Sequence, residues 1–106
     1  MAESCYRLTR DFPREEAFGL TSQIRRAAAS VPANIAERHG RENTRTVQYL
    51  RIAQGSLKEL ETHLLLAERV GIADRALIDI SMGRCESAGK MLRALIRSLQ
   101  EKTTKS

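Results

Sequence analysis

Few residues of this 106-residue chain have the types and spacing that catalysis or metal binding needs. Glu59 and His63 stand four residues apart, so on a helix they would share one face and could supply two metal ligands. His39 is the only other histidine, and a di-iron helical bundle needs Glu-x-x-His pairs with further inward glutamates. The sequence also has no glycine-rich phosphate loop and no Ser/His/Asp arrangement. We therefore expect no metal, no cofactor and no enzymatic activity.

The two cysteines indicate a reducing compartment. Cys5 and Cys85 lie far apart in the sequence and form no CxxC motif, which is typical of unpaired thiols. Cys85 is expected to be a small core side chain. The chain contains neither a run of about 18 apolar residues nor the apolar core of a signal peptide. We therefore expect a cytoplasmic protein without a membrane segment.

Basic residues provide the clearest functional signal. The 18 Lys and Arg residues exceed the 13 Asp and Glu residues, so the net charge is +5 and the pI is about 9.8. Two clusters are candidates for binding the phosphates of RNA or DNA without base recognition. They are Arg38, Arg41 and Arg45 near one predicted turn, and Lys90, Arg93 and Arg97 at i, i+3 and i+7. The alternative is a solvated face partly paired with Glu42, Glu86 and Glu101.

A second set of polar residues recurs at helical spacing. It consists of Ser30, Asn34 and Glu37 at i, i+4 and i+7, and of Ser56 and Glu59 at i and i+3. Either Arg25 or Arg26 could pair with a carboxylate there. A polar network between two helices specifies their register, because misaligned packing leaves a polar group unpaired at a cost of about 1–3 kcal/mol. The alternative interpretation is a ligand or catalytic pocket.

Helical periodicity runs through most of the chain and predicts the elements that must position these residues. Two heptad seams repeat every three and four residues: Leu50, Ala53, Leu57, Leu60, Leu64 and Ala67, and then Ile78, Ser81, Cys85, Ala88, Leu92, Leu95 and Leu99. We predict long helices over 14–40, 44–70 and 74–101 and a short one over 3–11, with a frayed tail at 102–106. Gly71 with Ile72 should end one helix in a Schellman motif, and Asp74 should cap the next. Pro32 should kink its helix without breaking it.

These elements predict a single all-α domain over residues 1–106, an antiparallel up-down four-helix bundle with a shortened first helix. Each long helix spans about 27 residues, or about 40 Å, whereas about a dozen residues precede Pro13. Several apolar residues lie off the seams: Ile52, Leu65, Leu66, Ile80, Met82, Met91 and Ile96. This surplus favours self-association, or a partner helix in the groove that the short first helix leaves.

Several stretches of the sequence closely resemble one bacterial family. They are FPREE (12–16), GLTSQIRRAA (19–28), SVPANIAE (30–37), GR (40–41), YL (49–50) and IAQGSLKELET (52–62). The chain is similar here to the four helix bundle proteins that are also called 23S rRNA-intervening sequence proteins. Arg38 and His39 depart from the family pattern, which has Gly and an aromatic residue at these positions.

The resemblance implies an antiparallel four-helix bundle that assembles into a homopentameric ring. It also implies a relation to the accessory variability proteins of diversity-generating retroelements, which bind nucleic acid and a reverse transcriptase. With the charge, it suggests a non-catalytic oligomeric scaffold that binds RNA, DNA or a nucleic-acid enzyme such as a reverse transcriptase. The alternative is a protein–protein interaction module that binds no nucleic acid.

Overall fold

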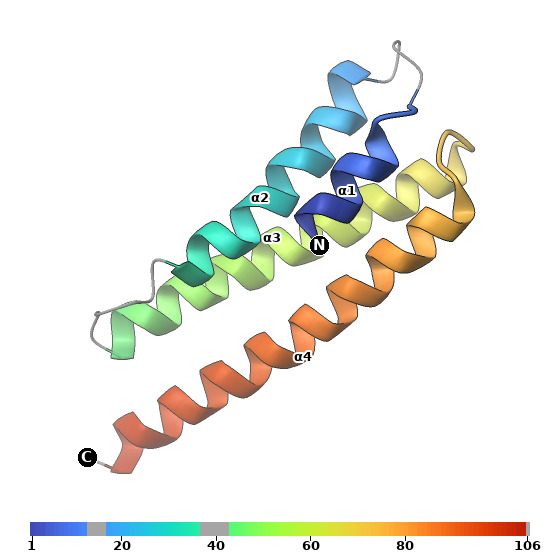
Figure 1. Ribbon diagram of the computed structural model, residues 1–106. Helices are drawn as coiled ribbons and strands as arrows, with labels where there is room; N and C mark the ends of the chain where they lie inside the picture. The colour runs from blue at the N-terminus through green and yellow to red at the C-terminus, as the bar shows by residue number, and fades with distance from the viewer. Residues whose placement is uncertain (13–16, 37–42, 106) are drawn as a thin grey trace.

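The chain folds into helices that run along one long axis (Figure 1). The computed structural model describes residues 1–12, 17–36 and 43–105, with side chains described within 1–12, 19–36 and 45–101. The elements are α1 (Ala2–Thr9), the π-helix η2 (Ala17–Thr21), α2 (Ser22–Ala36), α3 (Asn43–Arg69) and α4 (Arg75–Lys105). The described residues include no strand. The molecule measures 53 × 21 × 17 Å.

The helices form an antiparallel up-down four-helix bundle, as the sequence predicted. α1 packs on α2 and α4, and α3 packs on the other sides of α2 and α4. Successive helices run in opposite directions in Figure 1. α1 has 8 residues and α4 has 31, so the first helix is short, also as predicted.

The predicted signals at the turn between α3 and α4 are confirmed. Gly71 has φ 77°, the left-handed conformation that glycine adopts without a Cβ clash. The Ile72 N–H donates to the Ala67 carbonyl at 3.3 Å and the Gly71 N–H to the Glu68 carbonyl at 3.1 Å, which is the Schellman pattern. Asp74 Oδ1 accepts from the Ala76 N–H at 2.8 Å and caps α4. These bonds hold the two longest helices in an antiparallel arrangement.

Two of the predicted helices differ from the observed ones in extent. The first long helix is a π-helix containing Gly19 followed by α2, which continues through Pro32, so the proline does not break it. Its predicted start at 14–16 and end at 37–40 lie outside the described residues. α4 reaches Lys105, past the predicted end at 101 and into the tail that was expected to fray. The reason is that no Gly or Pro follows Gly89 to end the helix.

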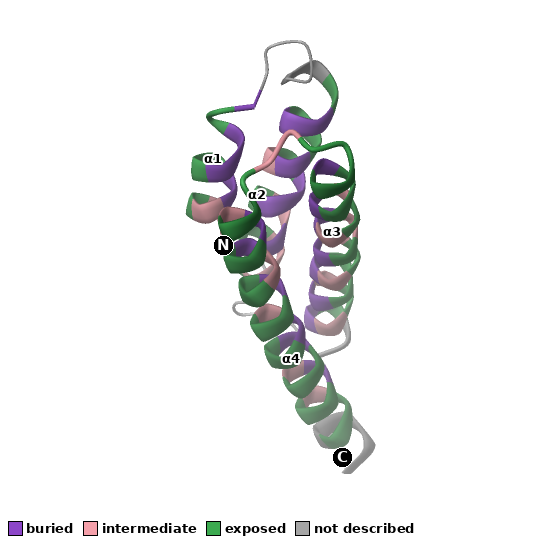
Figure 2. Cartoon of the chain, turned by 90° about the vertical axis from the view of Figure 1, so that its right-hand side faces the viewer, coloured by how far each residue is buried: buried purple, intermediate pink, exposed green. Residues whose placement is uncertain are grey.

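The core follows the seam of α3 closely and that of α4 only in part (Figure 2). All six predicted seam residues of α3 are buried. On α4 the buried side chains pass from Cys85 to Leu92 and Ile96, while Ala88, Leu95 and Leu99 are half-buried. Ile96 is 5% exposed, so its predicted off-seam position is wrong. A straight α-helix has 3.6 residues per turn and drifts by about 20° per heptad away from a 3.5-residue seam.

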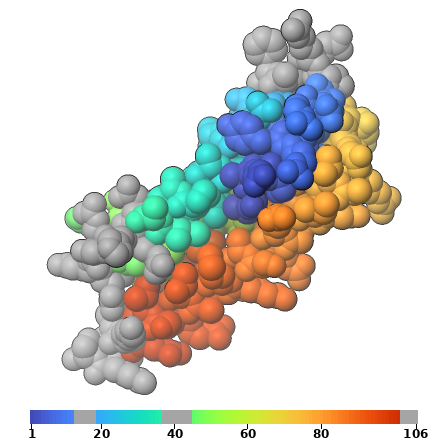
Figure 3. Space-filling model, viewed as in Figure 1, coloured from blue at the N-terminus to red at the C-terminus, as the bar shows by residue number. Residues whose placement is uncertain are grey.

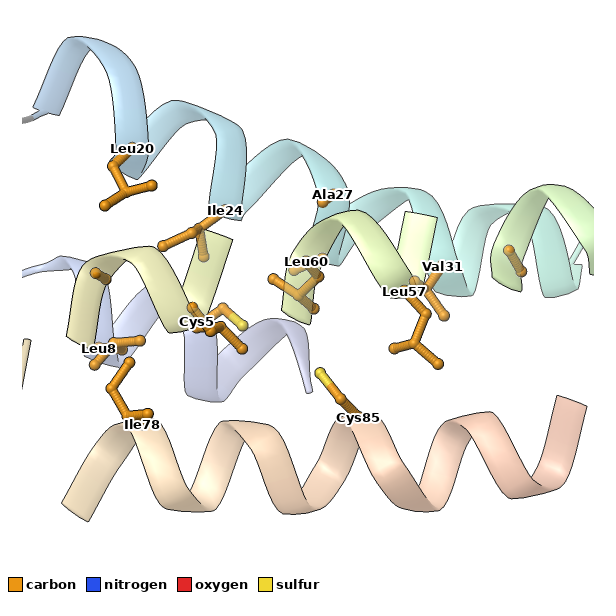
Figure 4. Close-up of a cluster of buried hydrophobic side chains, with 14 of the residues drawn as sticks. Cys5, Leu8, Leu20, Ile24, Ala27, Val31, Leu57, Leu60, Ile78 and Cys85 are labelled. Carbon is orange, nitrogen blue, oxygen red and sulfur yellow. The ribbon is translucent and has the colours of Figure 1, made fainter. Parts of the chain in front are cut away.

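The shortness of α1 does not open the core. Along its own length α1 buries Cys5 and Leu8 against Ile78 and Cys85 of α4 (Figure 4). On the face shown in Figure 3, α1 covers only the upper part of the bundle, and α2 and α4 continue beyond it. Val31 of α2 and Leu92 of α4 are 1% and 0% exposed there. The three long helices therefore cover their own core without a full first helix.

Candidate functional site

The predicted polar residues meet between α2 and α3. The hydroxyl oxygens of Ser30 and Ser56 are 2.7 Å apart and hydrogen-bonded. Asn34 Nδ2 donates to the Ser30 carbonyl at 2.8 Å and to the Ser30 hydroxyl at 3.1 Å. All three side chains are half-buried. Glu37, the third residue of the predicted set that contains Ser30 and Asn34, lies outside the described residues.

Glu59 extends this polar contact one turn further along α3. Its carboxylate forms an ion pair with Arg26 of α2, and its Oε1 lies 3.5 Å from His63 Nε2. The predicted pairing of an arginine with a carboxylate is thus made by Arg26. Arg25 instead donates from Nε to the Thr9 hydroxyl at 2.9 Å and stacks on the Tyr6 ring, 4.5 Å from its centroid. These contacts tie α2 to α3 and α1, which is consistent with the predicted role in register.

The groups that could hold a metal are dispersed. Within the described residues, no cluster of three or more His, Cys, Asp or Glu side chains is placed to bind an ion. Both cysteines are free and buried, as predicted for Cys85. Burial raises the pKa of Cys5, and burial together with the charges of Cys5 and Glu61 raises the pKa of Cys85 to about 12. A thiol with so high a pKa is a poor nucleophile at neutral pH.

The structure describes four of the six residues of the two predicted basic clusters. Arg38 and Arg41 lie outside the described residues, and Arg45 is exposed on the first turns of α3. Lys90, Arg93 and Arg97 are all exposed on α4, as their spacing predicted. Lys90 Nζ lies 3.8 Å from Glu86 Oε1, whereas the described residues offer Arg93 and Arg97 no ion pair. The positive charge of this cluster is therefore partly neutralised at Lys90.

Arg93 belongs to a groove between α3 and α4 that the sequence did not reveal. A hollow of about 530 Å³ is lined by the cationic side chains of Arg51, Lys58 and Arg93 and by one carboxylate, Glu61. The other lining residues are Gln54, Gly55, Leu57 and Gly89. Lys58 was absent from the predicted clusters. Its only signal was the seven-residue spacing from Arg51, which places both on one face of a helix.

The sign of the charge reverses along this groove. The adjoining hollow of about 480 Å³ is lined by the carboxylates of Glu61, Asp79 and Glu86 and by the cation of Arg93. Gly83 and Gly89 lie on its α4 side. The groove therefore has a cationic half toward the C-terminal end of α4 and an acidic half toward the Gly71 turn.

Basic residues outnumber acidic ones in the part of the bundle that α1 does not reach. We call residues 30–36, 43–58 and 88–105 the basic half. Five of its cations have no ion pair among the described residues: Arg45, Arg51, Lys58, Arg93 and Arg97. Glu101 is the only Asp or Glu within these ranges. The charge of the basic half is therefore not cancelled internally.

Exposed apolar side chains gather near the opposite end of α3. Leu65, Leu66 and Val70 are 48–53% exposed, as the off-seam positions of the two leucines predicted. Leu66 and Val70 border a shallow hollow of about 280 Å³ together with Gly19, Leu20, Gln23 and His63. Such a patch on a small protein is typical of a contact surface.

A protein-family model covers most of the chain. The family model described as 23S rRNA-intervening sequence protein matches residues 1–94. No curated protein matches the chain. None of the helices in the described part of the chain combines the length and the apolar character needed to cross a bilayer.

Proposed function

The chain belongs to the 23S rRNA-intervening sequence protein family, and on this premise we propose that it is a non-catalytic helical scaffold that binds RNA or DNA. The binding surface is the basic half, and the ligand is the sugar–phosphate backbone. Copies of the chain assemble in the cytoplasm into an oligomer, a ring of five by the family resemblance. This oligomer acts on nucleic acid directly or with a nucleic-acid enzyme such as a reverse transcriptase.

One observation carries the nucleic-acid part of the proposal, the set of unpaired cations in the basic half. Arg45, Arg51, Lys58, Arg93 and Arg97 have no carboxylate partner among the described residues. Phosphates that replace the counterions around such cations release those counterions into solution, which favours binding. An oligomer would repeat the same cations and raise the avidity further.

The chemistry of the surface favours contacts to phosphates over contacts to bases. The whole chain has two Tyr, two Phe and no Trp, so it offers few rings on which bases could stack. Tyr6 is already stacked against Arg25. The proposed binding is therefore tolerant of sequence and sensitive to salt.

Fluorescence anisotropy with a labelled single-stranded RNA across a series of salt concentrations tests this proposal. The affinity should fall steeply as salt rises, and the R93E/R97E variant should bind more weakly to every sequence tried. The matched control is R10E/R75E, which reverses two exposed, unpaired arginines outside the basic half. Absence of binding by the wild-type protein at low ionic strength would overturn the proposal.

A second candidate function is supported by the apolar patch of Leu65, Leu66 and Val70. In this alternative the chain is a protein–protein interaction module that binds no nucleic acid. Light scattering coupled to gel filtration separates the two. A discrete oligomer that is disrupted by L65E/L66E would place the patch in self-assembly, whereas a monomer would favour docking of another protein.

A further inference from the structure

We infer that the cationic half of the groove between α3 and α4 is the place where one nucleic-acid strand lies, with Arg51, Lys58 and Arg93 binding successive phosphates. This inference rests on the proposed function and narrows it from a charged surface to one groove. Three features of the groove support it: the convergence of its cations, its glycines and the reversal of its charge.

The cations converge from two helices onto one hollow. Arg51 and Lys58 lie two turns apart on α3, about 10 Å along the helix axis, and Arg93 faces them from α4. None of the three has an ion pair among the described residues. A strand that spaces its phosphates by at least about 3.4 Å would place at most about four of them within this length.

Two glycines shape the floor of the same hollow. A Cβ at Gly89 would lie 3.3 Å from Arg93 Nη1 and 3.5 Å from Leu57 Cδ2. The absence of a side chain at Gly89 therefore lets the guanidinium lie across α4 inside the groove.

Gly55 has a different environment. A Cβ there would meet no atom within 4 Å, so packing within the chain does not require glycine at this position of α3. Glycine disfavours the interior of a helix, and its presence here leaves the groove open to a ligand from outside.

The reversal of charge limits where the strand can run. Beyond Glu61, the carboxylates of Asp79 and Glu86 line the groove and would repel phosphates. The strand must therefore leave the groove toward Arg97 and the C-terminal end of α4.

Filling the two halves of the groove separately tests the inference. G55L would occupy the cationic half, and G83L would occupy the acidic half, where a Cβ also meets no atom within 4 Å. Both variants keep every charge and replace a helical glycine, so both should keep the helical circular dichroism and melt no lower than wild type. We expect G55L to weaken binding of a labelled oligo(dT) at least fivefold, while G83L stays within twofold of wild type.

A second pair of variants keeps the inference testable if G55L does not fold. R51Q/K58Q/R93Q removes the three groove cations, and R45Q/R75Q/R84Q removes three unpaired cations that lie outside the groove and outside the path of the strand. The slope of log affinity against log salt should become shallower by about 2 in the first variant, since each phosphate contact on a single strand contributes about 0.7. The change should be smaller in the second variant.

The possible results separate this inference from the proposed function. Equal losses of affinity in the two triple variants, or equal effects of G55L and G83L on affinity, would overturn the inference that the strand lies in the groove. Binding to a diffuse basic surface would then remain. A wild-type protein that does not bind the probe at low salt would overturn the proposed function and the groove with it.

Discussion

Raising the pH from 7 to 10.5 should destabilise the folded chain through Cys85 by about 2 kcal/mol. Cys85 is 0% exposed between α1 and α4 (Figure 4), and its pKa in the folded chain is about 12. Burial is the largest cause, and the negative charges that Cys5 and Glu61 carry at high pH add to it. In the unfolded chain the thiol is hydrated and titrates near the reference pKa of 9.0.

The sign and size of this destabilisation follow from proton linkage. Between pH 9 and 12 the folded chain keeps the Cys85 proton and the unfolded chain loses it, so unfolding is favoured as pH rises. The stability that Cys85 contributes is fully present below pH 9 and is lost progressively toward pH 12. At pH 10.5 the difference from the unfolded pKa is about 1.5 units, and at about 1.36 kcal/mol per unit the loss is about 2 kcal/mol.

Urea unfolding followed by circular dichroism at 222 nm, under reducing conditions at pH 7, 9 and 10.5, measures this loss. C85A is the reference because alanine does not titrate, and only the change of its stability with pH is compared. Wild type should lose about 2 kcal/mol more than C85A between pH 7 and 10.5. Equal losses in the two proteins would refute the assignment of a buried, neutral thiol at this position.

Three further predictions concern packing and turns. L92A should lower the free energy of unfolding by about 2–5 kcal/mol, because Leu92 is 0% exposed. I52A should lower it by less than about 0.5 kcal/mol, because Ile52 is 52% exposed. Similar losses for the two variants in urea titrations would contradict the described core. G71A should cost about 1–2 kcal/mol because Gly71 has φ 77°, and an unchanged melting temperature would argue against the Schellman turn. S30A and S56A should each cost about 1 kcal/mol, and the double variant should cost less than their sum, since either single change already breaks the Ser30–Ser56 bond. Strict additivity in this double-mutant cycle would contradict the bond.

Local signals in the sequence predicted most of the fold because they act within one or two turns of a helix. The seam of α3, the Gly71 and Asp74 signals and the short first helix all depend on neighbours close in sequence. The burial of Ile96 was missed because it depends on how far α4 drifts across α3 over several turns.

The sequence predicted individual residues of the candidate site but not which of them meet across two helices. The spacing of Ser30 and Asn34, and of Ser56 and Glu59, placed each pair on one helix face, and the structure joins the two faces through the Ser30–Ser56 bond. The groove was not predictable, because Arg93 was grouped by spacing with Lys90, whereas in space it faces Arg51 and Lys58. Spacing along one helix does not identify the residues across an antiparallel neighbour.

The sequence alone determined that the chain forms long amphipathic helices with defined ends, an excess of positive charge and few residues suited to catalysis. These properties follow from composition and from periods of three and four residues. Only the tertiary structure decided which cations share a groove and which are paired, and that α2, α3 and α4 bury Val31 and Leu92 without a longer α1. The physical reason is that the register and tilt of one helix against another are set by the packing of the whole core, to which every side chain along the interface contributes.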